Sequence, residues 1–304
     1  MKKLFAMVAL AFTVFSCGFG SSEKQQEKLT FYAGLQEDHA AMIAERFQKE
    51  TGIQTEFVRL SSGETLARLK AERDNMTASV WYGGPVDGIV AANEEGLIEA
   101  YISPEAKNIK EEFKEPNGVW TGIYVGYLGF VGNEKILKEK GIEMPKSWAD
   151  LLKPEYKGEI VVAHPGSSGT APGRMTGMGE TTVGITFLHD GIKYKKEGYS
   201  DLIFASPSEG TGYEIGGVAL LKNAPNSEAA KKFIDWVLKA ETQDLGKTVG
   251  SFQFLTNVNA TNPEEAKEIA NTKLIKYDFD WAGKNKKRLV DEFTKKTNAQ
   301  APKK

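Results

Sequence analysis

Four short turns combine glycine with hydroxyl, aromatic or histidine side chains, the residue types that hold small polar ligands. Each follows a segment whose residue pattern predicts a β-strand. In α/β proteins, ligands bind beyond the carboxyl ends of the strands, where helix N-termini and glycine N–H groups suit an anion such as phosphate. Taken singly, each turn is better explained by capping and turn chemistry, but together the four indicate a shared cleft. The turns are Gly34–His39, Ser61–Gly63, Trp81–Gly84 and His164–Thr170.

The pair His189-Asp190 follows a predicted strand, Val183 to Leu188, and a polar pair at a strand end is expected to face a cleft. His189 is placed to meet an anion, and Asp190 to accept hydrogen bonds from sugar hydroxyls. His164 occupies an equivalent strand end, whereas His39 is more simply a residue at the start of a helix. For any single histidine, a structural role is at least as good an explanation as a ligand contact.

Several function classes have no signal in the sequence. No His-Glu-x-x-His pattern or His/Cys cluster supports a zinc site. The segment Gly166–Gly169 lacks the G-x-S-x-G pattern of a nucleophile elbow, and no P-loop lysine follows it. The net charge is −2, or −4 without Lys2 and Lys3, and provides no basic face for nucleic acid. We therefore expect no enzymatic activity, cofactor, metal or nucleic-acid partner.

The N-terminus predicts export. Lys2 and Lys3 precede an apolar stretch, residues 4–15, that is too short to cross a membrane and is typical of a signal peptide. The only cysteine, Cys17, follows directly and resembles the acylated cysteine of bacterial lipoproteins. We expect a signal peptide at 1–17, a flexible tether at 18–28 and a lipid-anchored protein in the periplasm or at the cell surface. The alternative is an ordinary signal peptide whose cysteine is discarded.

From residue 29 onward, strand-like and helix-like segments alternate, which favours an α/β fold with a parallel sheet. The 304 residues exceed one ordinary core and suggest two lobes. Gly52 provides a helix stop, and Ser61 with Glu64 forms a capping-box pattern. The expected strands are 29–33, 53–60, 79–82, 123–133, 159–163, 181–188, 202–206 and 215–221. The expected helices are 39–51, 86–95 and 227–239, with others beginning near 61, 145, 242 and 263.

Six sequence blocks together resemble the ferric-binding family of extracellular solute-binding proteins, which serve bacterial ABC importers. The resemblance implies a type II periplasmic binding protein, an α/β fold whose two lobes close on a ligand. Two β-strand crossings, near Thr121–Val125 and Ile203–Ser206, would join lobe 1 (29–120 and 207–304) to lobe 2 (121–206), with the C-terminal helices free to contact lobe 2. The implied partners are a small anionic solute and an ABC permease, and the implied state is a monomer. The blocks are LTFYAGLQEDHAAMIAERFQKETGI (29–53), RLSSGETLARLKAE (59–72), VWYGGPVDGIVAANEEGLIE (80–99), GYLGFVGN (126–133), PKSWADLLKPEYKGEIVVAHPGSSGT (145–170) and SPSEGTGYEIGGVALLKNAPNSEAAKKFIDWVL (206–238).

Within that family the ferric binders use two adjacent tyrosines, and none of the ten tyrosines here is adjacent to another. At the corresponding place stands GITFLHDG (184–191), which looks like the branch that binds sugar phosphates. The resemblance to this branch implies that His189 and Asp190 hold the sugar together with either Glu209 or Glu214. It further implies that phosphate or hydroxyl contacts come from Ser61, Ser62, Ser167, Ser168 and Thr170. The residues implied to line the cleft are Trp81, Tyr82 and Tyr124.

In one place the chain departs from the family pattern. A segment of a few dozen residues normally separates the SSGTA turn from an SGxAPGRM-like segment, whereas here Thr170 leads straight into Ala171-Pro172-Gly173-Arg174-Met175. We expect a truncated second lobe and, because a residue before proline avoids the helical conformation, no helix starting at this turn. The leading hypothesis is a hexose-phosphate receptor. The alternatives are a ferric iron receptor of the same family and a surface lipoprotein with impaired binding.

Overall fold

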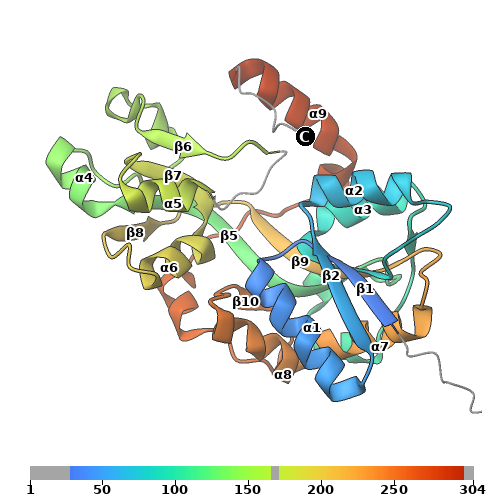
Figure 1. The fold of residues 1–304 in the computed structure, drawn as a ribbon. Helices are drawn as coiled ribbons and strands as arrows, with labels where there is room; N and C mark the ends of the chain where they lie inside the picture. The colour runs from blue at the N-terminus through green and yellow to red at the C-terminus, as the bar shows by residue number, and fades with distance from the viewer. Residues whose placement is uncertain (1–27, 166–170, 298–304) are drawn as a thin grey trace, which may run out of the picture.

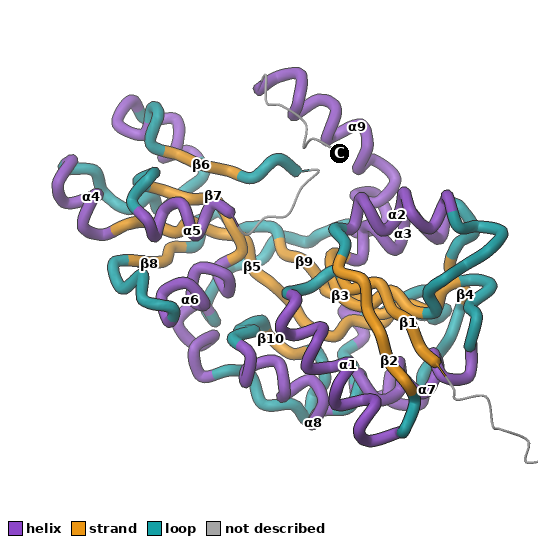
Figure 2. Tube along the Cα trace, in the orientation of Figure 1, coloured by secondary structure: helices purple, strands orange, loops and turns teal. Residues whose placement is uncertain are grey.

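The computed structural model describes residues 28–165 and 171–297, whose strands form one sheet covered by helices (Figures 1 and 2). The strands are β1 (Lys28–Ala33), β2 (Gln54–Arg59), β3 (Val80–Pro85), β4 (Ile98–Glu99), β5 (Thr121–Asn133), β6 (Ile160–Val162), β7 (Val183–Phe187), β8 (Leu202–Ala205), β9 (Tyr213–Leu221) and β10 (Phe254–Leu255). Their order is β2-β1-β3-β9-β5-β7-β6, with β4 beside β9 and with β8 and β10 beside β5.

Helices cover both faces of this sheet. The α-helices are α1 (Glu37–Thr51), α2 (Ser62–Ala71), α3 (Val86–Glu94), α4 (Glu134–Lys140), α5 (Ala171–Met178), α6 (Leu188–Lys196), α7 (Ser227–Val237), α8 (Ala240–Gln243) and α9 (Phe279–Thr297). Short 3-10 helices lie at Pro104–Asn108, Glu111–Phe113, Ala149–Leu152, Pro154–Tyr156, Asp244–Val249 and Glu264–Ile269. Near residues 145 and 263, where α-helices were expected, the chain forms only such 3-10 turns. Among the described residues, no helix is both long and apolar enough to cross a membrane.

Two lobes follow from the way β5 pairs along its length. Up to Tyr127 it pairs with β9, and from Leu128 onward it pairs with β7 and then β8. Lobe 1 therefore contains β1–β4, β9 and β10, and lobe 2 contains β6–β8; β5 runs through both (Figure 1). The chain returns to lobe 1 through residues 206–212, between β8 and β9. The expected architecture of two lobes and two crossings is confirmed, although each crossing lies slightly beyond the expected range, Thr121–Val125 for the first and Ile203–Ser206 for the second.

Lobe 1 has a large apolar core on each face of its sheet. Phe31 on β1 packs against Phe233 of α7, with ring centroids 5.0 Å apart, and Phe47 of α1 packs on the same ring at 5.1 Å. On the other face, Trp81 and Ile89 are fully buried among residues of α2 and α3. Burial of large apolar side chains on both faces fixes the sheet and therefore the position of the loops at its edge.

The predicted local signals of lobe 1 are confirmed. Gly52, with φ 74°, ends α1 in the left-handed conformation that favours glycine. At the start of α2, Ser61 Oγ accepts a hydrogen bond from the Glu64 N–H at 3.3 Å, and Glu64 Oε2 accepts one from the Ser61 N–H at 2.8 Å. This capping box fixes the direction of the first turn of α2.

The expectation that no helix starts after Thr170 is wrong. Helix α5 begins at Ala171, with Pro172 buried in its first turn. Proline is tolerated there because the first N–H groups of a helix have no intrahelical acceptor, so the missing N–H costs nothing. At the first helical position, the tolerance for a missing N–H therefore outweighs the preference of the residue before proline for a non-helical conformation.

The C-terminal part of the chain contacts both lobes. Helix α9, which the sequence analysis did not predict, packs on α3 so closely that a Cβ on Gly283 would lie 2.8 Å from a Val90 methyl carbon. The 3-10 helix Glu264–Ile269 packs on α6 of lobe 2, where Ile269 is buried. Lobe 2 is therefore held by C-terminal residues as well as by the two crossings.

Candidate functional site

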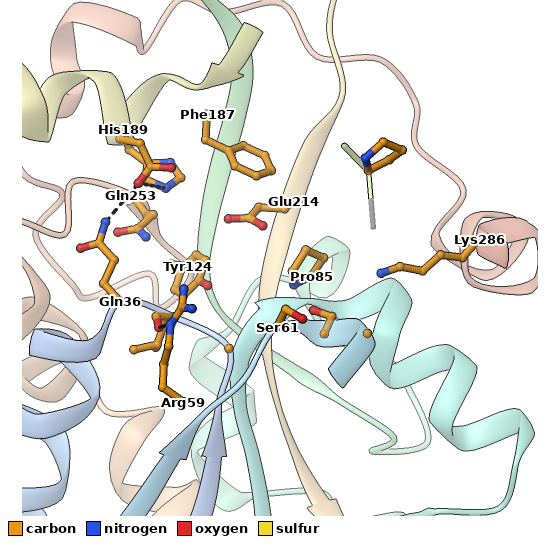
Figure 3. A pocket seen from close by; sticks show the side chains of 16 residues that line it. Gln36, Arg59, Ser61, Pro85, Tyr124, Phe187, His189, Glu214, Gln253 and Lys286 are labelled. Carbon is orange, nitrogen blue, oxygen red and sulfur yellow. Dashed lines mark hydrogen bonds and ion pairs between the residues drawn. The ribbon is translucent and has the colours of Figure 1, made fainter. Parts of the chain in front are cut away.

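A polar cleft of about 880 Å³, part of it open to solvent, lies between the lobes at the carboxyl ends of β1 and β2 (Figure 3). We call it the polar compartment. It brings together six of the residues expected at the site, Ser61, Ser62, Tyr124, His189, Asp190 and Glu214, and Gln36 of the expected turn Gly34–His39. Arg59, Gln253 and Lys286, which the sequence did not point to, also line it. Phe187 also lines it.

One wall of the polar compartment is the N-terminus of α2. Ser61, Ser62 and Gly63 line the cleft there, and the N–H groups of a first helical turn lack intrahelical partners. Ser62 packs against Gly84, where a Cβ would lie 3.0 Å from the serine Oγ. Arg59, the last residue of β2, lies beside this turn and donates from Nε to the Leu35 carbonyl oxygen at 3.3 Å. A helix N-terminus, serine hydroxyls and a guanidinium together form a surface suited to an anion.

The floor of the polar compartment contains Tyr124. Its hydroxyl accepts a hydrogen bond from the Gly84 N–H at 3.0 Å, and its ring lies on Gly216, where a Cβ would overlap the ring at 2.1 Å. Burial raises the pKa of Tyr124 well above its ordinary value, and the nearby Glu214 raises it further. Tyr124 is therefore a neutral hydrogen-bonding group held in one orientation.

The facing wall comes from lobe 2 and holds His189 and Asp190 (Figure 3). They were expected at an exposed strand end, but they lie in the first turn of α6 and are 3% and 4% exposed. The His189 ring stacks on Phe187 at 5.6 Å, and burial lowers its pKa. Its Nδ1 has no hydrogen-bond partner among the described residues, although it is buried. A neutral imidazole with an unused nitrogen can donate to or accept from a bound hydroxyl.

Glu214 lies on β9 next to this wall. His189 Nδ1 and Glu214 Oε1 lie 2.9 and 3.1 Å from the point that a Cβ on Gly126 would occupy, so only glycine leaves room for both. Burial raises the pKa of Glu214 to about 8, helped by the carboxylates of Asp190 and Asp87 and opposed by Lys286. A group with this pKa can donate as well as accept near neutral pH.

Of the two glutamates left open by the sequence analysis, only Glu214 lines the polar compartment. Glu209 is exposed and accepts a hydrogen bond from the Trp148 N–H at 3.1 Å, outside the cleft. The difference follows from the backbone, because Glu214 is part of β9 and is paired with Gly126 of β5, whereas Glu209 lies in the returning segment.

The expected cleft contacts of Trp81 and Tyr82 are not found in the polar compartment. Both are buried in lobe 1, where Trp81 Nε1 donates to the Gly83 carbonyl oxygen at 3.0 Å and Tyr82 packs on Phe233 with centroids 5.5 Å apart. The reason is that β3 lies inside the sheet, so its side chains project into the helical layers rather than beyond the strand end.

The remaining site residues from the sequence analysis fall elsewhere. Cys17, Ser167, Ser168 and Thr170 lie outside the described residues. His39 is buried at the start of α1, with its Nδ1 2.9 Å from Ser251 Oγ. Among the described residues, no group of three His, Cys, Asp or Glu side chains is placed to hold a metal ion.

The geometry agrees with comparisons to known proteins. A family profile for bacterial extracellular solute-binding proteins matches residues 89–173. An uncharacterized protein of Haemophilus influenzae is 34% identical, and the match covers 96% of this chain and 97% of that protein. The solved periplasmic binding protein AfuA of Actinobacillus pleuropneumoniae, with fructose-6-phosphate bound, is 35% identical, with a TM-score of 0.85 over 90% of this chain and 100% of that one. The chain belongs to the bacterial extracellular solute-binding proteins.

Membership of the solute-binding proteins makes this chain a periplasmic substrate-binding component of the kind that serves ABC importers. The ferric binding protein of Campylobacter jejuni shares the fold, with a TM-score of 0.76, but only 19% of its residues are identical. The alignment with the Haemophilus protein spans 336 positions, more than the 304 residues of this chain, so that relative has segments without a counterpart here. That the missing residues lie after Thr170 stays a prediction.

Proposed function

We propose that this protein captures a hexose phosphate between its lobes and delivers it to an ABC permease. One observation carries the proposal: at the N-terminus of α2 the polar compartment has a wall suited to an anion, and at His189, Asp190 and Glu214 it has a wall suited to sugar hydroxyls. The phosphate would lie against Ser61, Ser62 and Arg59, and the sugar hydroxyls against the second wall. A carboxylate that accepts hydrogen bonds from sugar hydroxyls forms charge-assisted hydrogen bonds, which add specificity as well as affinity.

Titration calorimetry and thermal unfolding of the chain from residue 18 onward test the proposal, with glucose 6-phosphate, fructose 6-phosphate, inorganic phosphate and ferric citrate. A ligand at 100 times its dissociation constant stabilises by about 2.7 kcal/mol, a melting shift of about 5–10 °C at this size. We expect that shift with a hexose phosphate, and a much smaller one with inorganic phosphate. A response to ferric citrate alone would replace the proposal with the iron receptor.

The paired variants Asp190→Asn and Asp201→Asn test the hydroxyl-binding wall. Loss of a hydrogen bond to a charged group costs about 1.5–3 kcal/mol, so Asp190→Asn should weaken hexose-phosphate binding by roughly ten- to a hundredfold. Asp201 is exposed and does not line the polar compartment, so Asp201→Asn should bind like the wild type. Equal affinities of the two variants would contradict the assignment of Asp190.

We also propose that the mature protein is anchored by a lipid on Cys17, because this lone cysteine directly follows the short apolar stretch 4–15. In cell fractionation, the wild type should be found with the membrane and Cys17→Ser with the soluble periplasmic fraction or as an unprocessed precursor. If both proteins are released as soluble, processed chains, the alternative of an ordinary signal peptide is correct.

A further inference from the structure

A second, apolar compartment adjoins the polar one. It contains about 1270 Å³ of space, part of it open to solvent, and lies between lobe 2 and the C-terminal segment. Val162, Ile185 and Phe187 line it from lobe 2, and Tyr277, Phe279 and Val290 line it from the C-terminal side. This is the side of the molecule on which α9 and β6 face each other (Figure 1). We call it the apolar compartment.

The two compartments share part of their lining. Pro85, Phe187, Glu214 and Lys286 line both, so the polar groups that would hold the sugar stand at the entrance to the apolar space. In Figure 3, Phe187 and Glu214 lie between His189 on one side and Lys286 on the other. The Phe187 ring, which stacks on His189 at 5.6 Å, offers apolar surface at this boundary. A ligand fixed in the polar compartment can therefore extend an apolar group past Phe187.

The polar contacts between the lobes leave the apolar compartment open. On the opposite side of the cleft, Gln36 Nε2 of lobe 1 already donates to Asp190 Oδ1 of lobe 2 at 3.0 Å, and Lys193 Nζ is 3.2 Å from Asp38 Oδ2. With the lobes in contact there, apolar side chains of the compartment still meet solvent, since Val162 is 47% and Leu289 39% exposed. Covering such surface with an apolar group is favourable, whereas a hexose phosphate alone offers only the small C–H faces of its sugar ring.

From these observations we infer that the ligand is a hexose phosphate carrying an aromatic substituent on the sugar, such as an aryl glycoside phosphate, with the aromatic ring in the apolar compartment. The inference rests on the proposed function, because the phosphate and the sugar keep the positions assigned above. The aromatic lining suits a flat ring, since Phe187, Tyr277 and Phe279 provide faces and edges for ring contacts.

Calorimetry with two matched ligands, phenyl β-glucoside 6-phosphate and methyl β-glucoside 6-phosphate, tests the inference, because they differ only in the ring. We expect the phenyl glycoside to bind at least roughly tenfold more tightly, as burial of one ring predicts. Ile185→Trp and Val290→Trp fill the compartment from opposite walls, and neither residue lines the polar compartment. Each should remove the phenyl advantage and leave the methyl glycoside affinity within about twofold.

A control variant and a second pair of ligands distinguish failure of this inference from failure of the proposed function. Val258→Trp places a tryptophan at an exposed site outside both compartments and should keep the phenyl advantage. Equal wild-type affinities for the two glycosides, or a phenyl advantage retained in both filled variants, would overturn the inference. If glucose 6-phosphate binds no better than inorganic phosphate, the proposed function itself has failed. Phenyl phosphate against inorganic phosphate then tests the compartment alone, with equal affinity counting against it.

Discussion

On the side of the cleft where α1 meets α6, polar side chains bridge the lobes, whereas on the side of α9 and β6 the lobes are separated by the apolar compartment. The bridge, which we call the latch, consists of Gln36, Asp38, Asp190 and Lys193. Lys193 Nζ donates to Gln36 Oε1 at 3.1 Å, and Gln36 Nε2 donates to Asp190 Oδ1 at 3.0 Å. The latch therefore ends on a residue that also lines the polar compartment.

The two sides of the cleft differ in how tightly their contacts fix the distance between the lobes. Hydrogen bonds require donor and acceptor to lie within narrow distances and angles, so the latch sets the separation of the walls that would hold the phosphate and the sugar. Apolar contact is non-directional and tolerates different shapes. We therefore expect the latch side to select one ligand geometry and the apolar side to accept substituents of different size.

The largest expected effect concerns the wall of the apolar side. Phe279 at the start of α9 packs on Tyr277, Tyr213 and Trp120, with centroids 4.6, 5.5 and 6.2 Å away. A buried Phe→Ala change costs about 3–5 kcal/mol, and partial exposure reduces this, so Phe279→Ala should destabilise by roughly 2–3 kcal/mol in urea unfolding. Trp281→Ala, in the same turn but half exposed, should cost less than about 1 kcal/mol. Similar losses in both variants would show that α9 is not held through Phe279.

The second prediction concerns Glu214, which stands between the two compartments. Its pKa in the folded protein is raised to about 8 from the ordinary 4.5, so between these values the folded state binds more protons than the unfolded state and stability falls as pH rises. His39, with a pKa lowered to about 4, and His189 act in the opposite direction, mainly below about pH 7. Between pH 7 and 8, where the histidines contribute little, the free energy of unfolding without ligand should fall by roughly 1 kcal/mol.

Paired variants isolate this pH dependence. Glu214→Gln cannot titrate, so its unfolding free energy should stay nearly constant from pH 7 to 8. Glu209→Gln removes an exposed carboxyl outside the cleft and should keep the wild-type slope. The assignment is wrong if Glu214→Gln retains that slope.

The features that could be predicted from the sequence are those that depend on residues close together in the chain. Gly52 and the pair Ser61 and Glu64 were identified because stop and capping signals involve residues close in the chain. His189 and Asp190 were placed at the cleft for a related reason, since they follow a strand directly, although the helix that contains them was not recognised.

What could not be predicted depends on packing between distant segments. The turn Trp81–Gly84 resembles a binding turn, but only the position of β3 inside the sheet shows that its aromatic side chains are buried. The choice of Glu214 over Glu209 requires the pairing of β9 with β5. Lys286 was missed together with α9, although Phe279, Ala282, Lys286, Leu289 and Phe293 recur at helical spacing that could have indicated the helix.

The smallest expected effect concerns the latch itself. Lys193 is the only residue of the latch that bonds both Gln36 and Asp38, so Lys193→Met should loosen the contact between α1 and α6 and leave Asp190 less well oriented. Because Asp38 is largely exposed, solvent screens the ion pair, and we expect the affinity for glucose 6-phosphate to fall by only about tenfold or less. The loss should lie in faster dissociation, measurable by surface plasmon resonance.

Lys138→Met is the matched control, because Lys138 also lies in lobe 2 but pairs with Glu134 of its own helix α4, at 2.9 Å, rather than with α1. It should leave the dissociation rate unchanged. Small-angle scattering of the ligand-free proteins adds a structural readout, since only Lys193→Met should increase the radius of gyration. If Lys193→Met binds and scatters like the control, the polar side does not set the separation of the lobes. The two strand crossings and the contact of Glu264–Ile269 with α6 would then suffice to hold lobe 2 in place.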